Sequence, residues 1–183
     1  MLFRSNLCNT IFFCGCFLPA LRRQYDGVAS HAAEIKAICQ QHNLPYWRGH
    51  ADLFDGLAKI RCGRADAGFK RARRGIEGLI GANAFMNGTF LLYAEACLDA
   101  GRTAEAAENL ARALPAIEHG EVWLSAEYHR LQGRVAEARD DDAAARTSFE
   151  TALRIARSQG ARLFEERAEH ALAALAAEQA AVS

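Results

Sequence analysis

The stretch LSAEYHRLQGRVAEARDDDAAARTSFETAL, residues 124–153, decides the fold. In its first half, large apolar residues recur at alternating steps of four and three, which is the period of an amphipathic helix. A polar turn around Asp140 follows, and the second half returns to a helical pattern with Ala145, Phe149 and Ala152 on one stripe. The stretch therefore predicts two helices joined by a short turn. The apolar positions of the first helix are Leu124, Tyr128, Leu131, Val135 and Ala138.

The same pair of helices recurs upstream at a period of 38 or 39 residues. Self-similarity at such a period is typical of proteins built from stacked supersecondary units. Six columns align at this period: Gly56, Ala94 and Gly133; Gly63, Gly101 and Asp140; Gly68, Ala106 and Ala145; Ala72, Leu110 and Phe149; Gly75, Ala113 and Ala152; Ile76, Leu114 and Leu153.

Each column predicts a structural role. The small residue of the first column lies midway along the first helix, where a partner helix approaches closely. The Gly, Gly, Asp column is typical of a tight turn between helices. The later columns form one stripe on the second helix, and Phe69, Ala72, Ile76 and Leu79 give that helix its apolar face in the earliest pair. Thr103 and Asp142 are the predicted N-caps of two second helices.

The period extends to both ends of the chain. We expect residues 1–44 to form a degenerate N-terminal helix pair, and residues 45–183 to form the repeat domain with a closing helix over 161–179. The predicted fold is all-α, a right-handed superhelix of about four helix pairs plus the closing helix. The apolar segment 7–21 is shorter than the ~20 residues that a membrane span needs. Arg22 and Arg23 follow it, which is the wrong flank for a signal peptide. Because the period places it at the position of a first helix, we interpret it as a repeat helix and expect no membrane association.

Composition limits the partners. The chain has 183 residues, 51% of them hydrophobic, with 22 basic and 22 acidic side chains. Residues 1–80 carry 12 basic and 6 acidic residues, net +6, whereas residues 81–183 carry 10 basic and 16 acidic, net −6. This asymmetry allows head-to-tail self-association or oppositely charged partners, and equally two differently solvated halves. Six scattered cysteines without zinc-type spacing indicate reduced core residues in a cytoplasmic protein, and we expect no metal or other cofactor.

A family resemblance follows from these columns. Gly133, Ala145, Phe149 and Ala152 resemble the tetratricopeptide repeat, although the period exceeds that repeat's ~34 residues. Three further motifs, within residues 94–106, 123–133 and 152–161, are similar to the C-terminal helical repeat region of bacterial signalling ATPases that carry an adenylate or guanylate cyclase-like domain.

The resemblance implies a non-catalytic protein-binding or sensor module of a signalling or transcription-control assembly. It implies a protein partner such as an ATPase or cyclase module. Since the sequence lacks G-x-x-x-x-G-K-[ST], neither ATP hydrolysis nor cyclase activity is carried over, and we expect no enzyme. One alternative is that the chain is a truncated remnant of a larger ATPase.

Two groups of residues are candidates for partner binding. Arg130 and Arg134 lie one turn apart on a first helix, where they would grip an acidic segment of a partner by bidentate contacts. Glu127 lies three residues before Arg130, a spacing typical of an ion pair on a helix surface.

The second group is the basic run of residues 70–74, in which Lys70 and Arg73 are the candidate contacts. A nucleic-acid-binding regulator would use such a helix for phosphate contacts, and this is the second alternative. Because no aromatic platform is interleaved with the charges, the sequence disfavours nucleic acid and favours a solvated helix face.

Overall fold

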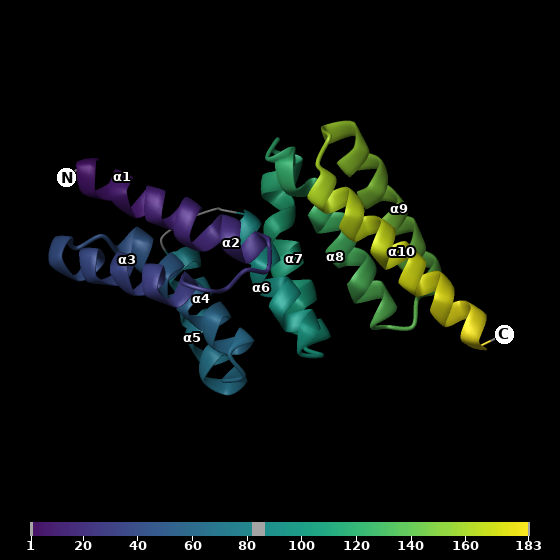
Figure 1. The fold of residues 1–183 in the computed structure, drawn as a ribbon, viewed down its shortest axis with the longest axis horizontal. Helices are drawn as coiled ribbons and strands as arrows, with labels where there is room; N and C mark the ends of the chain where they lie inside the picture. Colours follow the sequence, from purple (N-terminus) through teal and green to yellow (C-terminus); the bar gives the residue numbers. More distant parts are fainter. Residues whose placement is uncertain (1, 82–86, 183) are drawn as a thin grey trace. The chain divides into compact units, whose positions relative to one another are not determined.

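The computed structural model describes residues 2–81 and 87–182. It is 87% helix, and the described residues contain no strand (Figure 1). The all-α prediction is therefore confirmed. Between residues 2 and 81 and between 87 and 182, no helix combines the length and apolarity that crossing a membrane requires.

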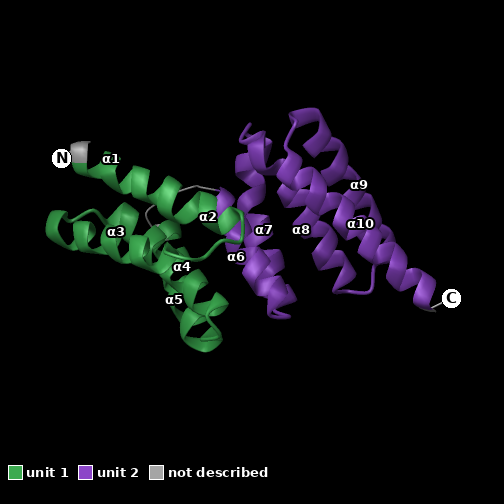
Figure 2. Cartoon of the chain, in the orientation of Figure 1, with its two compact units in different colours: residues 1–85 green, residues 86–183 purple. Residues whose placement is uncertain are grey.

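The chain divides into two compact units, residues 1–85 (unit 1) and residues 86–183 (unit 2) (Figure 2). The charge asymmetry of the sequence follows this division, because residues 81–85 carry no charge. Unit 1 therefore has a net charge of +6 and unit 2 a net charge of −6. The boundary predicted between residues 44 and 45 lies inside unit 1, between two helices that pack on each other. The division into a degenerate N-terminal pair and a repeat domain stays a prediction.

Unit 1 begins with one continuous helix of three segments, in which a π-helical stretch interrupts regular α-helix. Backbone angles at Thr10, Phe17 and Leu18 are helical, so the chain does not break at the junctions. Three further helices follow and pack in sequence order. The elements are α1 (Leu2–Thr10), η1 (Ile11–Phe17), α2 (Leu18–Leu21), α3 (Val28–His42), α4 (Pro45–Arg61) and α5 (Ala65–Gly81).

The N-terminal helix of unit 1 buries one face in an aromatic cluster. The ring centroid of Phe12 lies 4.6 Å from that of His50, 5.5 Å from that of Phe54 and 5.8 Å from that of Trp47. The indole Nε1 of Trp47 donates to Ser5 Oγ at 3.0 Å. The apolar segment 7–21 thus contributes to the core of unit 1, since aromatic rings dominate the free energy of burial.

Glycines allow α4 and α5 to cross at close range. A Cβ on Gly56 would lie 2.5 Å from the backbone nitrogen of Ala72 and 2.7 Å from the carbonyl oxygen of Gly68. A Cβ on Gly75 would overlap the backbone nitrogen of Leu53. Backbone atoms cannot give way as a side chain can, so this crossing requires residues without a side chain. The close approach predicted for the first column is confirmed in this pair.

Unit 2 contains two helix pairs and a final helix. In the second pair, the ring of Phe149 occupies the space that a side chain at Gly133 would need. The final helix packs on both helices of that pair, and Leu175 joins Ala145 and Phe149 in the core. The elements are α6 (Asn87–Asp99), α7 (Thr103–Glu118), η2 (Val122–Leu124), α8 (Ser125–Glu137), α9 (Asp142–Gln159) and α10 (Arg162–Val182).

The turns within the helix pairs share one backbone geometry. Gly63, Gly101 and Asp140 have φ values of +78°, +70° and +59°. In each turn, the next residue donates its N–H to a carbonyl five residues earlier, as in a Schellman motif. The predicted turn column is confirmed. The three hydrogen bonds are Arg64 N to Lys59 O at 2.9 Å, Arg102 N to Cys97 O at 2.8 Å, and Asp141 N to Ala136 O at 3.0 Å.

The predicted N-caps were wrong by one residue. Asp141, not Asp142, caps α9 and accepts a hydrogen bond from Ala144 N at 3.0 Å. Arg102, not Thr103, occupies the N-cap position of α7. The caps are displaced because both turns have the same geometry, in which a single residue lies between the left-handed residue and the first residue of the next helix.

Candidate functional site

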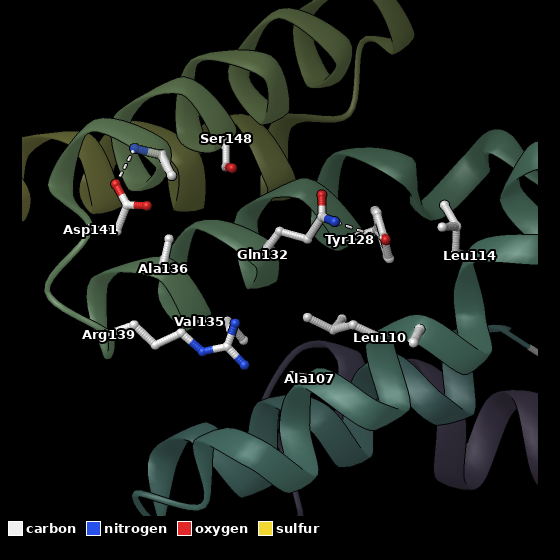
Figure 3. A pocket seen from close by; sticks show the side chains of 12 residues that line it. Ala107, Leu110, Leu114, Tyr128, Gln132, Val135, Ala136, Arg139, Asp141 and Ser148 are labelled. Atoms are coloured by element: carbon white, nitrogen blue, oxygen red, sulfur yellow. Dashed lines mark hydrogen bonds between the residues drawn. The ribbon is translucent and has the colours of Figure 1, made fainter.

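A surface groove that is open to a ligand lies between α7 and α9 in unit 2. The groove has a volume of about 550 Å³ (Figure 3). Residues of α8 form its floor, and α7 and α9 provide its walls. Its lining residues are Ala107, Leu110, Ala111 and Leu114 from α7, Tyr128, Gln132, Val135 and Ala136 from α8, Arg139 and Asp141 from the turn, and Ala144 and Ser148 from α9.

The groove exists because neighbouring helices of unit 2 pack unequally. The helix α10 packs along α9, and there Ala171, Leu172 and Leu175 join a core that contains Phe149. The helix α8 packs less closely on α7, although it holds the equivalent place one repeat earlier. Small side chains on the wall, among them Ala107 and Ala111, leave the space between these helices unfilled.

The floor of the groove combines apolar and polar groups. The amide nitrogen of Gln132 donates to the hydroxyl of Tyr128 at 2.9 Å, as Figure 3 shows. Burial raises the pKa of Tyr128, so its hydroxyl is neutral and is available as a hydrogen-bonding group rather than as a base. Val135 and Ala136 continue the floor with apolar surface.

One end of the groove carries charge. Arg139 is exposed, and its guanidinium reaches toward Val135 in Figure 3. Within the described part of the chain its side chain makes no hydrogen bond or ion pair. Asp141 lies at the same end, with Oδ1 bound to the N–H of Ala144. This end of the groove thus presents both the guanidinium of Arg139 and the carboxylate of Asp141, so it carries charges of both signs.

A buried ion-pair network joins three helices of unit 2 elsewhere. Arg130 on α8 donates to Glu95 on α6 at 2.8 Å, and to both carboxylate oxygens of Glu127 at 2.7 and 2.9 Å. Arg167 on α10 donates to Glu127 at 2.8 Å. The side chains of Glu95, Glu127 and Arg130 are at most 8% exposed. Burial raises the pKa of Glu127, but Arg130 and Arg167 lower it by more, so its pKa is below the usual value.

These contacts locate the residues predicted from the sequence. Glu127 and Arg130 do form an ion pair, but the pair is buried between helices and not on a helix surface. Arg134, one turn further, pairs with Asp99 at 2.9 Å and remains 24% exposed. All three therefore hold α8 against its neighbours, and their contact with a partner stays a prediction.

The other predicted residues, Lys70 and Arg73, are exposed on α5 in unit 1. Arg71 in the same run is drawn away from solvent by ion pairs with Asp52 at 3.2 Å and Asp55 at 3.1 Å. The basic face of α5 is consequently narrower than the run of charges in the sequence indicates.

The groove and the position of Arg139 at its end were not predicted from the sequence. A weak signal for the groove was present, since Gln132 is a polar residue whose counterpart 39 residues later, Ala171, packs against the core. No group of three or more His, Cys, Asp or Glu residues that would hold a metal occurs among residues 2–81 and 87–182. Comparison with protein-family models, with curated proteins and with solved structures gave no match.

Proposed function

We propose that the chain is a non-catalytic helix-pair solenoid that binds a protein partner through unit 2. The observation that carries this proposal is the groove between α7 and α9. It is open, mostly apolar, and supplied with a tyrosine and an arginine, residue types that are enriched at protein interfaces.

The repeated turn geometry supports the solenoid part of the proposal. In three helix pairs, the first helix ends at a residue in the left-handed conformation, and the same backbone hydrogen bond closes the turn. This is expected of one structural unit repeated along the chain. Such repeats offer extended surfaces between stacked helices, and these proteins use such surfaces to bind other proteins.

The resemblance to the repeat region of cyclase-domain signalling ATPases gives the proposal its context. In that context the partner is an ATPase or cyclase module, and binding regulates a signalling or transcription-control assembly. The interpretation as a truncated remnant has the same partner chemistry, because the ATPase would then be joined in the same chain.

Site-specific photo-crosslinking in the source cells tests the proposal. A benzophenone amino acid replaces Ala111, an exposed residue of the groove, or Ala33, an exposed residue of α3 that serves as the matched control. We expect a discrete protein crosslinked through position 111 and not through position 33. Crosslinks to nucleic acid, or no protein crosslink at position 111, would overturn it.

A binding assay with labelled DNA distinguishes the nucleic-acid alternative from the proposed protein binding. Because Arg71 is already paired within unit 1, we expect no binding of a duplex or a single strand at 50 mM salt. Binding that weakens steeply toward 200 mM salt and is lost when Lys70 and Arg74 are replaced by glutamate would favour the alternative over the proposal.

A further inference from the structure

We infer that the exposed face of the N-terminal helix, residues 2–21, docks on α10 of a second copy of this chain. The contact joins unit 1 of one copy to unit 2 of another and does not involve the groove. It gives the opposite charges of the two units a defined pair of surfaces.

The N-terminal helix carries apolar side chains on its exposed side as well as on its buried side. Leu7 and Leu18 are 41% and 46% exposed, and between them Ile11 is half-buried and Cys14 is exposed. These four residues, the leucine stripe, recur at steps of four, three and four, the spacing of one stripe on a helix. Because a helix that is apolar on both sides is normally covered on both, the leucine stripe indicates a surface that a partner buries.

The charges next to the leucine stripe are basic. Arg4 is the only charged side chain before position 22, and Arg22 and Arg23 directly follow the helix. On α3, which packs against this helix, the charges of Glu34 and Lys36 have opposite signs. The leucine stripe is thus an uncharged surface with cations at both ends, and it favours an apolar partner surface with acidic ends.

The exposed side of α10 has the complementary pattern. Residues 171–177 contain no charge, and the exposed residues Glu166 and Glu178 lie before and after them. Because alanine side chains are small, the larger side chains of a second helix can pack between them. The exposed alanines at steps of four and three are Ala173, Ala177 and Ala180.

A second copy is the occupant that charge favours. Unit 1 has a net charge of +6 and unit 2 a net charge of −6, so unlike units attract and like units repel. Pairing of two leucine stripes would bring Arg4 and Arg22 of one copy close to the same arginines of the other, which opposes a symmetric dimer. A contact between unlike surfaces is heterologous and leaves one surface of each kind open to further copies.

A lipid surface fits the leucine stripe less well. The exposed residues Asn6, Asn9 and Thr10 lie beside the stripe and keep it narrow. Helices that lie in a membrane interface bury a broader apolar face, so the width of the stripe favours a single helix as its partner.

Sedimentation velocity of the whole chain at about 20 mM salt tests the inference. Leu18→Gln shortens the leucine stripe without changing any charge, and we expect it to weaken self-association at least roughly fivefold. The matched control is Ile80→Gln, which removes an apolar side chain of unit 1 that is 48% exposed, and we expect less than a roughly twofold change. Equal association of both variants would mean that net charge alone drives it, and would overturn the inference, as would a monomeric wild type.

Crosslinking identifies the surface that the leucine stripe contacts. The exposed thiol of Cys14 lies within the stripe, and Cys62→Ser removes the other exposed thiol. In this background, copies that retain Cys14 are mixed with copies that carry Cys14→Ser and Ala173→Cys, and a short bismaleimide is added. We expect a dimer that joins Cys14 to position 173, and none when Ala143→Cys, at an exposed position of α9, replaces Ala173→Cys. Dimers that join two Cys14 thiols, with none at position 173, would overturn α10 as the partner surface.

The charged ends of the two helices have their own readout. We expect Arg22→Glu to weaken self-association roughly three- to tenfold. Mixing this variant with Glu166→Arg should restore association if the helices are antiparallel, and mixing it with Glu178→Arg should do so if they are parallel. No restoration in either mixture would refute the pairing of charges at the helix ends.

Vesicles of phosphatidylserine and phosphatidylcholine are a further probe. Flotation of the wild type with these vesicles that Leu18→Gln abolishes, together with a monomer in sedimentation, would make the leucine stripe a lipid-binding surface and overturn the inference. The photo-crosslink at position 111 involves neither the N-terminal helix nor α10. Failure of the inference therefore leaves the proposed function standing, and failure of the proposed function leaves the inference standing.

Discussion

Arg130 illustrates how the packing of helices changes the meaning of a single residue. In the sequence it is an arginine on a first helix, available to an acidic partner. In the structure its side chain is 8% exposed, and its guanidinium binds both Glu95 and Glu127. Burying charges costs solvation free energy, and pairing offsets that cost only while every partner is present. Arg130 therefore supports the contact between α6 and α8.

Removing Arg130 should be far more destabilising than removing Arg134. We expect Arg130→Ala to lower the free energy of unfolding by about 3–5 kcal/mol, because it leaves a buried carboxylate without its main partner. Arg134→Ala, which breaks one part-exposed pair with Asp99, should cost about 1 kcal/mol or less. Urea unfolding followed by circular dichroism measures both, and equal losses would contradict a buried network.

The burial of His50 makes the stability of the protein depend on pH. It is fully buried among Phe12, Tyr46 and Trp47, and neither ring nitrogen has a hydrogen-bond partner among the described residues. Burial lowers the pKa of His50 to about 3, so the ring is neutral in the folded protein. The unfolded chain protonates this histidine near its ordinary pKa of ~6.5. Between those two values the unfolded state binds more protons, and stability falls with falling pH.

The pH dependence of unfolding therefore depends on His50. Relative to His50→Leu, the wild type should lose about 2 kcal/mol of unfolding free energy between pH 7 and pH 5, since each pH unit below the unfolded pKa costs up to about 1.4 kcal/mol. Urea titrations of both proteins at the two pH values measure the difference. A difference that does not change with pH would mean that His50 is protonated or solvated in the folded state.

At the scale of elements, the crossing of α4 and α5 depends on the absence of side chains at Gly56, Gly68 and Gly75. Glycine in a helix interior lowers helix stability, so its repeated use here requires a compensating benefit in packing. The benefit is that backbone of one helix lies directly on backbone of the other. Paired glycines can thus be recognised in a sequence, but their partners across the crossing cannot.

Two glycine-to-alanine changes separate packing from helix propensity. A Cβ at Gly56 would meet backbone atoms of Gly68 and Ala72, so Gly56→Ala should destabilise unit 1 by about 1–3 kcal/mol. At Gly78 the nearest atom would lie 3.6 Å away, so Gly78→Ala should stabilise the protein by up to about 1 kcal/mol. Thermal unfolding checks the opposite signs, and the same sign for both would show that the crossing is not tight.

At the scale of the whole molecule, the chain consists of two compact units with net charges of +6 and −6. Opposite charge on two units of one chain favours association between the unlike units of different copies at low ionic strength. Salt screens such interactions, because the Debye length shortens from about 30 Å at 0.01 M to about 3 Å at 1 M.

We therefore expect salt-dependent self-association. Sedimentation velocity should show a concentration-dependent increase in mass at about 20 mM salt that disappears at about 500 mM. Replacing Lys70, Arg73 and Arg74 by glutamine, which reduces the charge of unit 1, should weaken the association at low salt. A monomer under every condition, or association that increases with salt, would rule out an electrostatic cause.

The same scales show which features could be predicted. The helices, the left-handed turn residues at Gly63, Gly101 and Asp140, and the buried stripe of Phe69, Ala72, Ile76 and Leu79 followed from the sequence. The N-caps were displaced by one residue, because the cap is set by the turn before it. The burial of Arg130 and the open groove beside Arg139 could not be predicted, since both depend on how closely successive helix pairs approach.

The sequence by itself determined the all-helical fold and the positions of its turns, because helical periodicity and the left-handed conformation of glycine or aspartate are properties of a few neighbouring residues. The tertiary structure alone decided which charges are buried and which are available. Arg130 is enclosed because α6 brings the carboxylate of Glu95 and α10 brings Arg167 to the Glu127 of α8. The side chain of Arg139, in the turn after α8, is exposed. Contacts between helices distant in sequence have no local signature, so packing settles them.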